Sequence, residues 1–254
     1  MKISIITLFP NMIQGFFNES IIKKAQDKGI VEIEIVDLRT FAIDSYGTVD
    51  DRPYGGGAGM VIRPDVLVEA LKKVTKGKTK KKVFLTSAKG KPFTERKAEE
   101  LTKEKHIVII AGHYEGFDER VMKHIDEEVS LGDFVLTGGE IPAAAIVDAV
   151  VRLLPGVLKK SDATKEESFF QMPVDDLIEV CGEDEVLGLL KKNNIHKVQL
   201  VEYPHYTRPE MFEGEGVPEV LTSGNHQEVR KWRIRQAYQQ TKEKRPDLLD
   251  IKRI

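Results

Sequence analysis

Residues 106–140 read HIVIIAGHYEGFDERVMKHIDEEVSLGDFVLTGGE, and this stretch decides the fold. It begins with an apolar run at 106–111, which is the pattern of a buried strand. Loops that contain glycines and acidic residues follow at 112–120 and 131–140, so we expect two strands to end in such loops. Ligands bind at the carboxyl ends of strands in open α/β sheets, and glycines let a backbone approach a ligand closely. The stretch therefore predicts a ligand site.

The start of the chain also indicates an open α/β sheet. Residues 3–9 have the pattern of a buried strand, 12–27 that of an amphipathic helix stopped by Gly29, and 31–37 that of a second strand. This β-α-β order predicts a parallel sheet and an α/β fold. Further helices are expected at 64–74, 94–103, 119–124 and 141–154, with a strand at 83–86.

The composition is that of a globular protein, with 41% hydrophobic and 31% charged residues. The 254 residues allow one large domain or two smaller ones. A single cysteine, Cys181, permits no intrachain disulfide and fits a reducing compartment. The apolar start is too short for a signal peptide or a membrane span. We therefore expect a cytoplasmic protein with no membrane association.

Charge is unevenly distributed along the chain. The formal net charge of −2 argues against a general nucleic-acid coat, because non-specific binding depends on neutralising phosphates. Basic residues nevertheless cluster at 72–82 and at 230–235. Local basic patches on an acidic chain suit a protein that binds one nucleic acid selectively. A solvated loop explains the lysine run equally well.

A glycine-rich segment, Arg52-Pro53-Tyr54-Gly55-Gly56-Gly57-Ala58-Gly59, lies in a region without a convincing period. It lacks the lysine of a phosphate-binding loop and the third glycine of a dinucleotide fingerprint. Asp50, Arg52 and Tyr54 suit contact with a nucleic acid, arginine for phosphate or guanine edges and tyrosine for stacking. A flexible tight turn is the alternative.

Five segments together resemble a known family. They are Gly112-x-Tyr114-Glu115-Gly116-x-Asp118-Glu119-Arg120, Gly132-Asp133-x-Val135-Leu136-x-Gly138-Gly139-Glu140, residues 50–57, residues 204–209, and residues 223–226 ahead of Trp232-Arg233. The chain is similar in these segments to the bacterial tRNA (guanine-N1)-methyltransferases of the knotted methyltransferase superfamily. The resemblance implies a parallel sheet with a deep trefoil knot and a small helical C-terminal domain. We expect a knotted domain at 1–160, a linker with an insertion at 161–200, and a tRNA-binding domain at 201–254.

The resemblance also implies S-adenosylmethionine as the methyl donor. Its cradle would be formed by Leu85, Thr86, Ser87, Gly112, Tyr114, Glu115, Leu131, Gly132, Asp133, Phe134, Val135, Leu136 and Gly138. Without the resemblance, Glu115 and Asp133 would be interpreted as acids that cap neighbouring amides. None of the six histidines has metal-ligand spacing with another, and a need for a divalent ion stays open.

Methylating guanine at N1 requires a base for the N1 proton and a cation near O6. By position in the family motifs, Arg152 would supply the cation and Glu167 the base. The family has aspartate where this chain has Glu167, so the carboxylate reaches further by one methylene. The alternative is that Glu166 or Asp162 acts as the base and Glu167 is a solvated charge.

The remaining expectations concern tRNA. The residues expected to contact it are Asp50, Arg52, Tyr54, Ser168, Thr207, Arg208, His226 and Arg233. The last helix opens at Ser223-Gly224-Asn225, which is good capping chemistry, and Trp232 on it is expected in the core. Relative to the family, residues 170–197 are expected to be an acidic helical insertion.

The expected function is transfer of a methyl group from S-adenosylmethionine to N1 of guanosine 37 of tRNA. The resemblance implies a homodimer whose active site is shared between subunits. One alternative is a methyltransferase of the same fold that acts on another RNA position. A second is a non-catalytic RNA-binding relative, and an enzyme that binds nucleotide phosphates on residues 55–59 ranks last.

Overall fold

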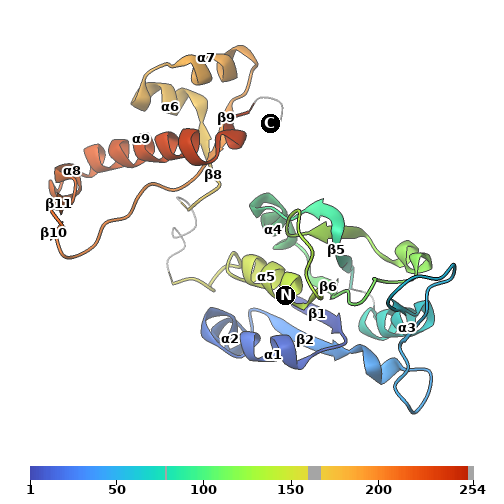
Figure 1. Cartoon of the computed structure of the whole chain (residues 1–254). Helices are drawn as coiled ribbons and strands as arrows, with labels where there is room; N and C mark the ends of the chain where they lie inside the picture. The colour runs from blue at the N-terminus through green and yellow to red at the C-terminus, as the bar shows by residue number, and fades with distance from the viewer. Residues whose placement is uncertain (78, 160–166, 251–254) are drawn as a thin grey trace. The chain divides into compact units, whose positions relative to one another are not determined.

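The computed structural model describes residues 1–77, 79–159 and 167–250. The chain divides into two compact units, Met1–Ser161 and Asp162–Ile254 (Figure 1). The first unit contains a parallel sheet and the second is mainly helical. No helix among the described residues is long and apolar enough to span a membrane.

The five-stranded sheet of the first unit has the order β2-β1-β6-β5-β7, and all neighbouring strands are parallel. The bounds are β1 Lys2–Thr7, β2 Glu32–Asp37, β5 Lys82–Pro92, β6 His106–Ile110 and β7 Glu127–Ser130. Every residue of central strand β6 is buried. The parallel α/β sheet predicted from the sequence is therefore confirmed. β5 is longer than the predicted strand at 83–86, and β7 is the second strand that was expected before the loop at 131–140, although its bounds were not predicted.

Helices cover both faces of this sheet (Figure 1). On one face lie α1 Asn11–Phe17, α2 Ser20–Asp27, α4 Glu95–Leu101 and α5 Glu140–Val151. On the other lie α3 Pro64–Val74 and the 3-10 helices η1 Leu38–Phe41 and η2 Glu119–His124. Alternate residues of β6 point to opposite layers, Ile107 and Ile109 to the first and Val108 and Ile110 to the second. Burial on both faces explains why this strand is an unbroken apolar run.

The single helix predicted at 12–27 is wrong in one respect, because the chain forms two helices there. Glu19 is extended and Ser20 has φ +53°, so helical geometry breaks between Phe17 and Ser20. Asn18 and Ser20 are polar residues whose side chains compete with helical hydrogen bonds. Ile13 of α1 and Ile22 of α2 still pack in the same cluster, which is why the apolar period spans the break.

The second unit contains its own core. Antiparallel strands β8 Phe170–Pro173 and β9 Lys197–Leu200 pack with α6 Val174–Cys181, α7 Glu185–Lys192, α9 His226–Lys244 and η3 Pro246–Leu249. The remaining elements there are β10 Met211–Phe212, β11 Glu215–Gly216 and α8 Glu219–Thr222. Asn225 caps α9 by accepting hydrogen bonds from the N–H groups of Gln227 and Glu228, as predicted.

Two expectations for this unit need correction. Residues 170–200 are a structured part of the unit rather than a linker, because Val174, Leu177, Leu187 and Leu190 lie in its core. Their helical spacing places the intervening acids on the outside. Trp232 is only half-buried and lies outside the core cluster, where its ring is 6.2 Å from that of Tyr206.

Candidate active site

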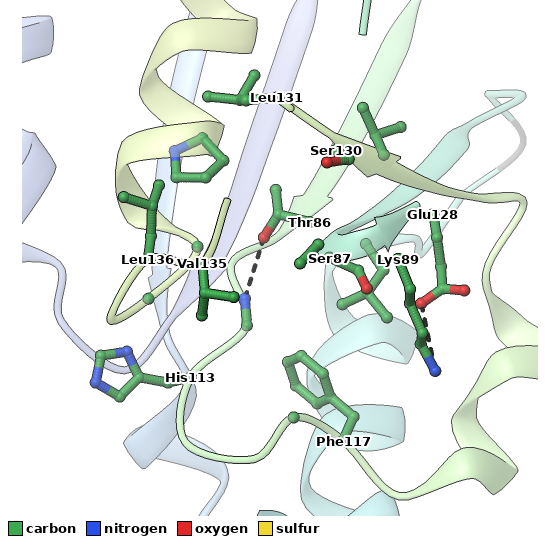
Figure 2. Close-up of a pocket in the computed structure, with 18 of the residues that line it drawn as sticks. Thr86, Ser87, Lys89, His113, Phe117, Glu128, Ser130, Leu131, Val135 and Leu136 are labelled. Atoms are coloured by element: carbon green, nitrogen blue, oxygen red, sulfur yellow. Dashed lines mark hydrogen bonds and ion pairs between the residues drawn. The ribbon is translucent and has the colours of Figure 1, made fainter. Parts of the chain in front are cut away.

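A cleft of about 510 Å³ opens beyond the carboxyl ends of β6 and β7 in the first unit (Figure 2). Three segments line it, at 85–89, 112–119 and 128–139. The residues predicted for the cofactor that line the cleft are Leu85, Thr86, Ser87, Gly112, Tyr114, Glu115, Leu131, Gly132, Phe134, Val135, Leu136 and Gly138. Asp133 is exposed and is not among the described residues that line it. Three segments far apart in the sequence, one of them within β5, thus form one site.

Backbone groups and small residues hold these loops together. The Thr86 hydroxyl donates to the carbonyl of Ile110 (3.1 Å) and accepts from the N–H of Gly112 (3.2 Å), the second contact being drawn in Figure 2. The N–H of Gly139 donates to the carbonyl of Gly112 (2.6 Å). A Cβ at Gly139 would collide with Thr86 and Gly112. Only glycine therefore permits this approach.

The loop after β6 is also tied to the end of the glycine-rich segment. The Glu115 N–H donates to the carbonyl of Met60 (3.1 Å), and the Ile62 N–H donates to that of Gly116 (2.9 Å). Tyr114 has φ +58°, a conformation that side chains seldom adopt outside constrained sites. The short hairpin β3 Asp50–Asp51 and β4 Val61–Ile62 flanks the segment. The predicted tRNA-contacting loop is thus anchored at one end to the cleft wall.

Charged groups gather at one rim of the cleft. Lys89 Nζ lies 3.9 Å from carboxylate oxygens of both Glu119 and Glu128, and Figure 2 shows the Lys89–Glu128 pair. At these distances the pairs are loose, and Lys89 is well exposed. Nearby, the hydrogen bond from Arg120 lowers the pKa of Asp118 to about 2, so this carboxylate stays ionised. The Asp118 side chain also accepts from the Arg120 N–H and starts η2.

Sequence reasoning missed several residues that line the cleft, notably Lys89, His113, Phe117 and Glu128. His113 and Phe117 lie inside the quoted motif, so their position alone was a usable signal. Lys89 lies after Thr86, in a segment whose sequence resembles a turn. The structure continues β5 through it, but no alternation of apolar residues there indicates a strand. Glu128 belongs to β7, a strand whose bounds were not predicted.

The two residues predicted for catalysis lie in different units. Arg152 follows the last residue of α5 and is half-buried, and it is not among the described residues that line the cleft. Glu167 is half-buried in the second unit, where its carbonyl accepts from the Phe170 N–H (3.1 Å). The alternative bases Asp162 and Glu166 lie outside the described residues.

The residues predicted for tRNA contact are mostly exposed. Tyr54 is fully exposed and Arg52 is exposed, whereas Asp50 in β3 is half-buried. In the second unit Thr207, Arg208 and His226 are exposed, and Ser168 accepts through its hydroxyl from the Glu202 N–H (3.2 Å). Arg233 lies over the Tyr203 ring at 4.8 Å.

The lysine run has mixed surroundings. Lys72 pairs with Glu69 (2.6 Å), Lys73 lies over the Phe41 ring (5.3 Å), and Lys81 donates to the Gly77 carbonyl (2.7 Å). Several of these lysines thus have local partners. No group of three or more His, Cys, Asp or Glu side chains within residues 1–77, 79–159 and 167–250 is placed to hold a metal ion.

The parallel sheet, with its cleft beyond the strand ends and glycine loops as walls, defines an open α/β protein, a class in which cofactors and nucleotides bind at this place. The chain belongs to the tRNA (guanine-1)-methyltransferase family, because the model described as tRNA (Guanine-1)-methyltransferase TrmD matches residues 1–251. This confirms the resemblance found in the motifs.

Curated relatives agree with this assignment. The chain is 46% identical over 251 residues to a tRNA (guanine-N(1)-)-methyltransferase of Geobacillus kaustophilus, covering 98% of this chain and 92% of the relative. It is 47% identical over 250 residues to the enzyme of that name from Dictyoglomus turgidum, covering 98% and 90%. The corresponding protein of Pelotomaculum thermopropionicum is 47% identical over 252 residues, with the same coverage.

Proposed function

We propose that this protein transfers a methyl group from S-adenosylmethionine to N1 of guanine in tRNA, at position 37. The observation that carries the proposal is the family match over residues 1–251. The cleft supports it, since about 510 Å³ is in the range of small-molecule sites.

The residues of the cleft fit this donor. Leu85, Leu131, Val135 and Leu136 offer apolar surface for an adenine ring, and the glycines leave peptide groups open to polar atoms. The bound donor supplies an electrophilic methyl on a sulfonium. The task of the cradle is to hold that methyl in line with N1, because alignment of reacting groups provides much of a transfer rate.

The chain must also manage the proton and the charge of the guanine. In the proposal, the Glu167 carboxylate takes the proton from N1, so that the electron pair of N1 can form the new bond to carbon. The Arg152 guanidinium stabilises the negative charge that develops on O6. The residues proposed to hold the tRNA are Asp50, Arg52, Tyr54, Ser168, Thr207, Arg208, His226 and Arg233.

The proposal includes a homodimer with a shared site. Met12 and Phe16 on α1 are 53% and 48% exposed, and Ile141 at the start of α5 is 60% exposed. Helices α1 and α5 pack together, so these apolar side chains lie on neighbouring elements. Exposed apolar surface of this kind suits contact with a second copy.

We also propose that the segments lining the cleft form a deep trefoil knot in the cytoplasmic protein. In support, the Gly112–Gly139 hydrogen bond and the bridge between His113 and Gly138 bring together the loops that follow β6 and β7, as such a knot requires. A crystal structure with the donor bound would test the path of the chain.

The direct test is labelled methyl transfer from S-adenosylmethionine to a tRNA transcript with guanosine at position 37, beside the same transcript with adenosine there. Transfer to the first transcript alone is expected. Transfer to both would place the target elsewhere. Donor binding without transfer to any tRNA would favour a non-catalytic RNA-binding protein.

A further inference from the structure

The first residue of α5, Glu140, has a fully buried carboxylate. Burying a carboxylate is costly unless hydrogen bonds or a charge compensate for the lost water. The rest of α5 is strongly apolar, with Ala143, Ile146 and Val147 in the core cluster. Packing alone would favour an apolar side chain here, so the contacts of this acid are informative.

One carboxylate oxygen is well satisfied. The Thr7 hydroxyl at the end of β1 donates to Oε1 of Glu140 (2.7 Å) and accepts from the Phe9 N–H (2.9 Å). The Thr7 proton is therefore committed to the carboxylate. A hydrogen bond to a charged acceptor is stronger than one between neutral groups.

The other oxygen faces an imidazole. Oε2 of Glu140 lies 3.6 Å from Nδ1 of His113, whose ring stacks obliquely on that of Phe9 at a centroid distance of 4.6 Å. Both atoms are buried and neither has a hydrogen-bond partner within the described part of the chain. A small movement would bring them into hydrogen-bond range. The two buried atoms without hydrogen-bond partners thus face each other.

These contacts lie directly behind the wall of the cleft. His113 and Gly138 line the cleft and are joined by a bridge between their backbones. A Cβ on Gly138 would collide with both the Glu140 carboxylate and the His113 imidazole. Figure 2 shows His113 on the side of the cleft away from Lys89 and Glu128. Thr7 and Glu140 are not among the described residues that line the cleft.

We propose that Glu140 is a positioning residue for the methyl donor, fixing the spacing between the loop after β6 and the loop before α5. Its carboxylate connects Thr7, on the central part of the sheet, to His113, and so holds the backbones of residues 112–113 and 138–139 against each other. The proposal rests on the proposed function, since it assumes that the donor lies between these loops. If Glu140 had a purely structural role, it would stabilise the fold without affecting the affinity for the donor.

The test compares two buried hydroxyls on the same strand. Thr7→Val removes the hydroxyl beside the cleft, and Thr7→Ser restores it. Ser4→Ala is the matched control, because the Ser4 hydroxyl is also buried and donates to a carboxylate, that of Glu34 (3.1 Å), away from the cleft. Glu140→Gln keeps the size of the side chain and an acceptor for Thr7, and replaces the negatively charged oxygen that faces His113 with an uncharged amide NH2.

The dissociation constant of S-adenosylmethionine is measured by calorimetry, the unfolding midpoint by heating, and kcat and KM by methyl transfer. Thr7→Val is expected to weaken donor binding about tenfold, the order expected for a hydrogen bond to a charged group. KM for the donor rises in parallel, while kcat at saturating donor changes little. Glu140→Gln weakens binding as well, whereas Thr7→Ser and Ser4→Ala bind like the wild type.

The proposal would be overturned if Thr7→Val and Glu140→Gln lowered the unfolding midpoint but bound the donor with wild-type affinity. Glu140→Gln keeps the test decisive if Thr7→Val does not fold. Wild-type protein that binds the donor and methylates no tRNA would overturn the proposed function only, because the comparison of affinities would still stand.

Discussion

The backbone N–H of Gly139 donates to the carbonyl of Gly112 across 2.6 Å, which joins two loops that the sequence presents as separate motifs. The first loop follows β6 and the second precedes α5. Their contact closes one wall of the cleft, so the geometry of this wall depends on the absence of a side chain at Gly139.

Gly139→Ala is therefore expected to separate the two loops, because the added methyl would collide with Thr86 and Gly112. Overpacking of this kind should cost about 1–3 kcal/mol in the free energy of unfolding. Calorimetry should show donor binding lost. Gly15→Ala in α1, where a Cβ meets nothing within 4 Å, is the control and should be stabilising by up to about 1 kcal/mol. If Gly139→Ala bound the donor with normal affinity, the close approach of Gly139 to Gly112 would not be needed for donor binding.

Glu167→Gln should reduce the rate of single-turnover methylation by about 10²-fold or more, the usual contribution of a general base. Its affinity for S-adenosylmethionine should be unchanged, because the lining of the cleft belongs to the first unit. Glu166→Gln and Asp162→Asn are the controls and should keep nearly normal rates. A large loss in either control, with Glu167→Gln active, would assign the base to that residue instead.

Mixing two inactive variants tests whether the site is shared. In the proposed dimer, Arg152→Ala and Glu167→Gln subunits should together restore about a quarter of wild-type activity after random exchange. Half of the dimers then contain one subunit of each variant. In each of these dimers, one of the two sites has both a wild-type Arg152 and a wild-type Glu167. The measurement is methyl transfer after mixing at increasing concentration. If dimers shown to contain one subunit of each variant had no methyl-transfer activity, each site would belong to one subunit.

His106 should make the stability of the protein depend on pH. Burial, with help from the charges of Lys2 and Lys81, lowers the pKa of His106, whose ring contacts the Ser4 hydroxyl at 3.0 Å. The folded state therefore takes up a proton less readily than the unfolded chain. Stability should be level above a pH of about 6.5, where the unfolded histidine is neutral, and should fall as pH drops from there to the folded-state pKa. His106→Gln should show a shallower fall in urea unfolding between pH 7 and 5, and an equal slope would contradict the assignment.

Asp184 should be a main stabilising contact of the second unit. Its carboxylate accepts from the Tyr238 hydroxyl (2.9 Å), from Lys242 (2.8 Å) and from the Leu187 N–H at the start of α7 (2.9 Å). Asp184→Ala removes a helix cap and leaves a buried hydroxyl unpaired, so a loss of about 2–3 kcal/mol is expected. Trp232 is the single tryptophan and reports unfolding of this unit by fluorescence. Tyr238→Phe should cost less, about 1 kcal/mol, and equal losses would contradict this ranking.

The fold of the first unit was largely predictable because its strands β1 and β6 are buried on both faces and helices such as α3 are amphipathic. Local patterns of this kind located β1, β2, β6 and α3. The same patterns did not locate the bounds of β7, the strand expected before the loop at 131–140, because its sequence Glu127-Glu128-Val129-Ser130 is polar and short. It joins the sheet by pairing with β5 at Phe84–Thr86 and again at Lys91 and Pro92, on the two sides of a register shift.

The glycine motifs indicated most of the cleft, since close backbone approach requires residues that are visible in the sequence. Contacts between distant residues gave no such signal. Thr7 and Glu140 are separated by 133 positions, and each taken alone is an ordinary polar residue at the end of a strand or the start of a helix. In the second unit, residues 170–197 were expected to be helical, but their acids gave no sign that the apolar residues between them form part of the core.

The wall formed by Gly112, Gly138 and Gly139 consists of peptide groups, and this has a consequence for inhibition of the protein. An inhibitor that hydrogen-bonds to main-chain atoms there would meet groups that a point mutation cannot delete. A larger residue at Gly138 or Gly139 would collide with neighbouring atoms of the protein, so a resistance mutation there would also distort the site of the enzyme. Drug resistance would have to arise from the side chains at the rim, with exposed Lys89 and Val135 as the first positions to monitor.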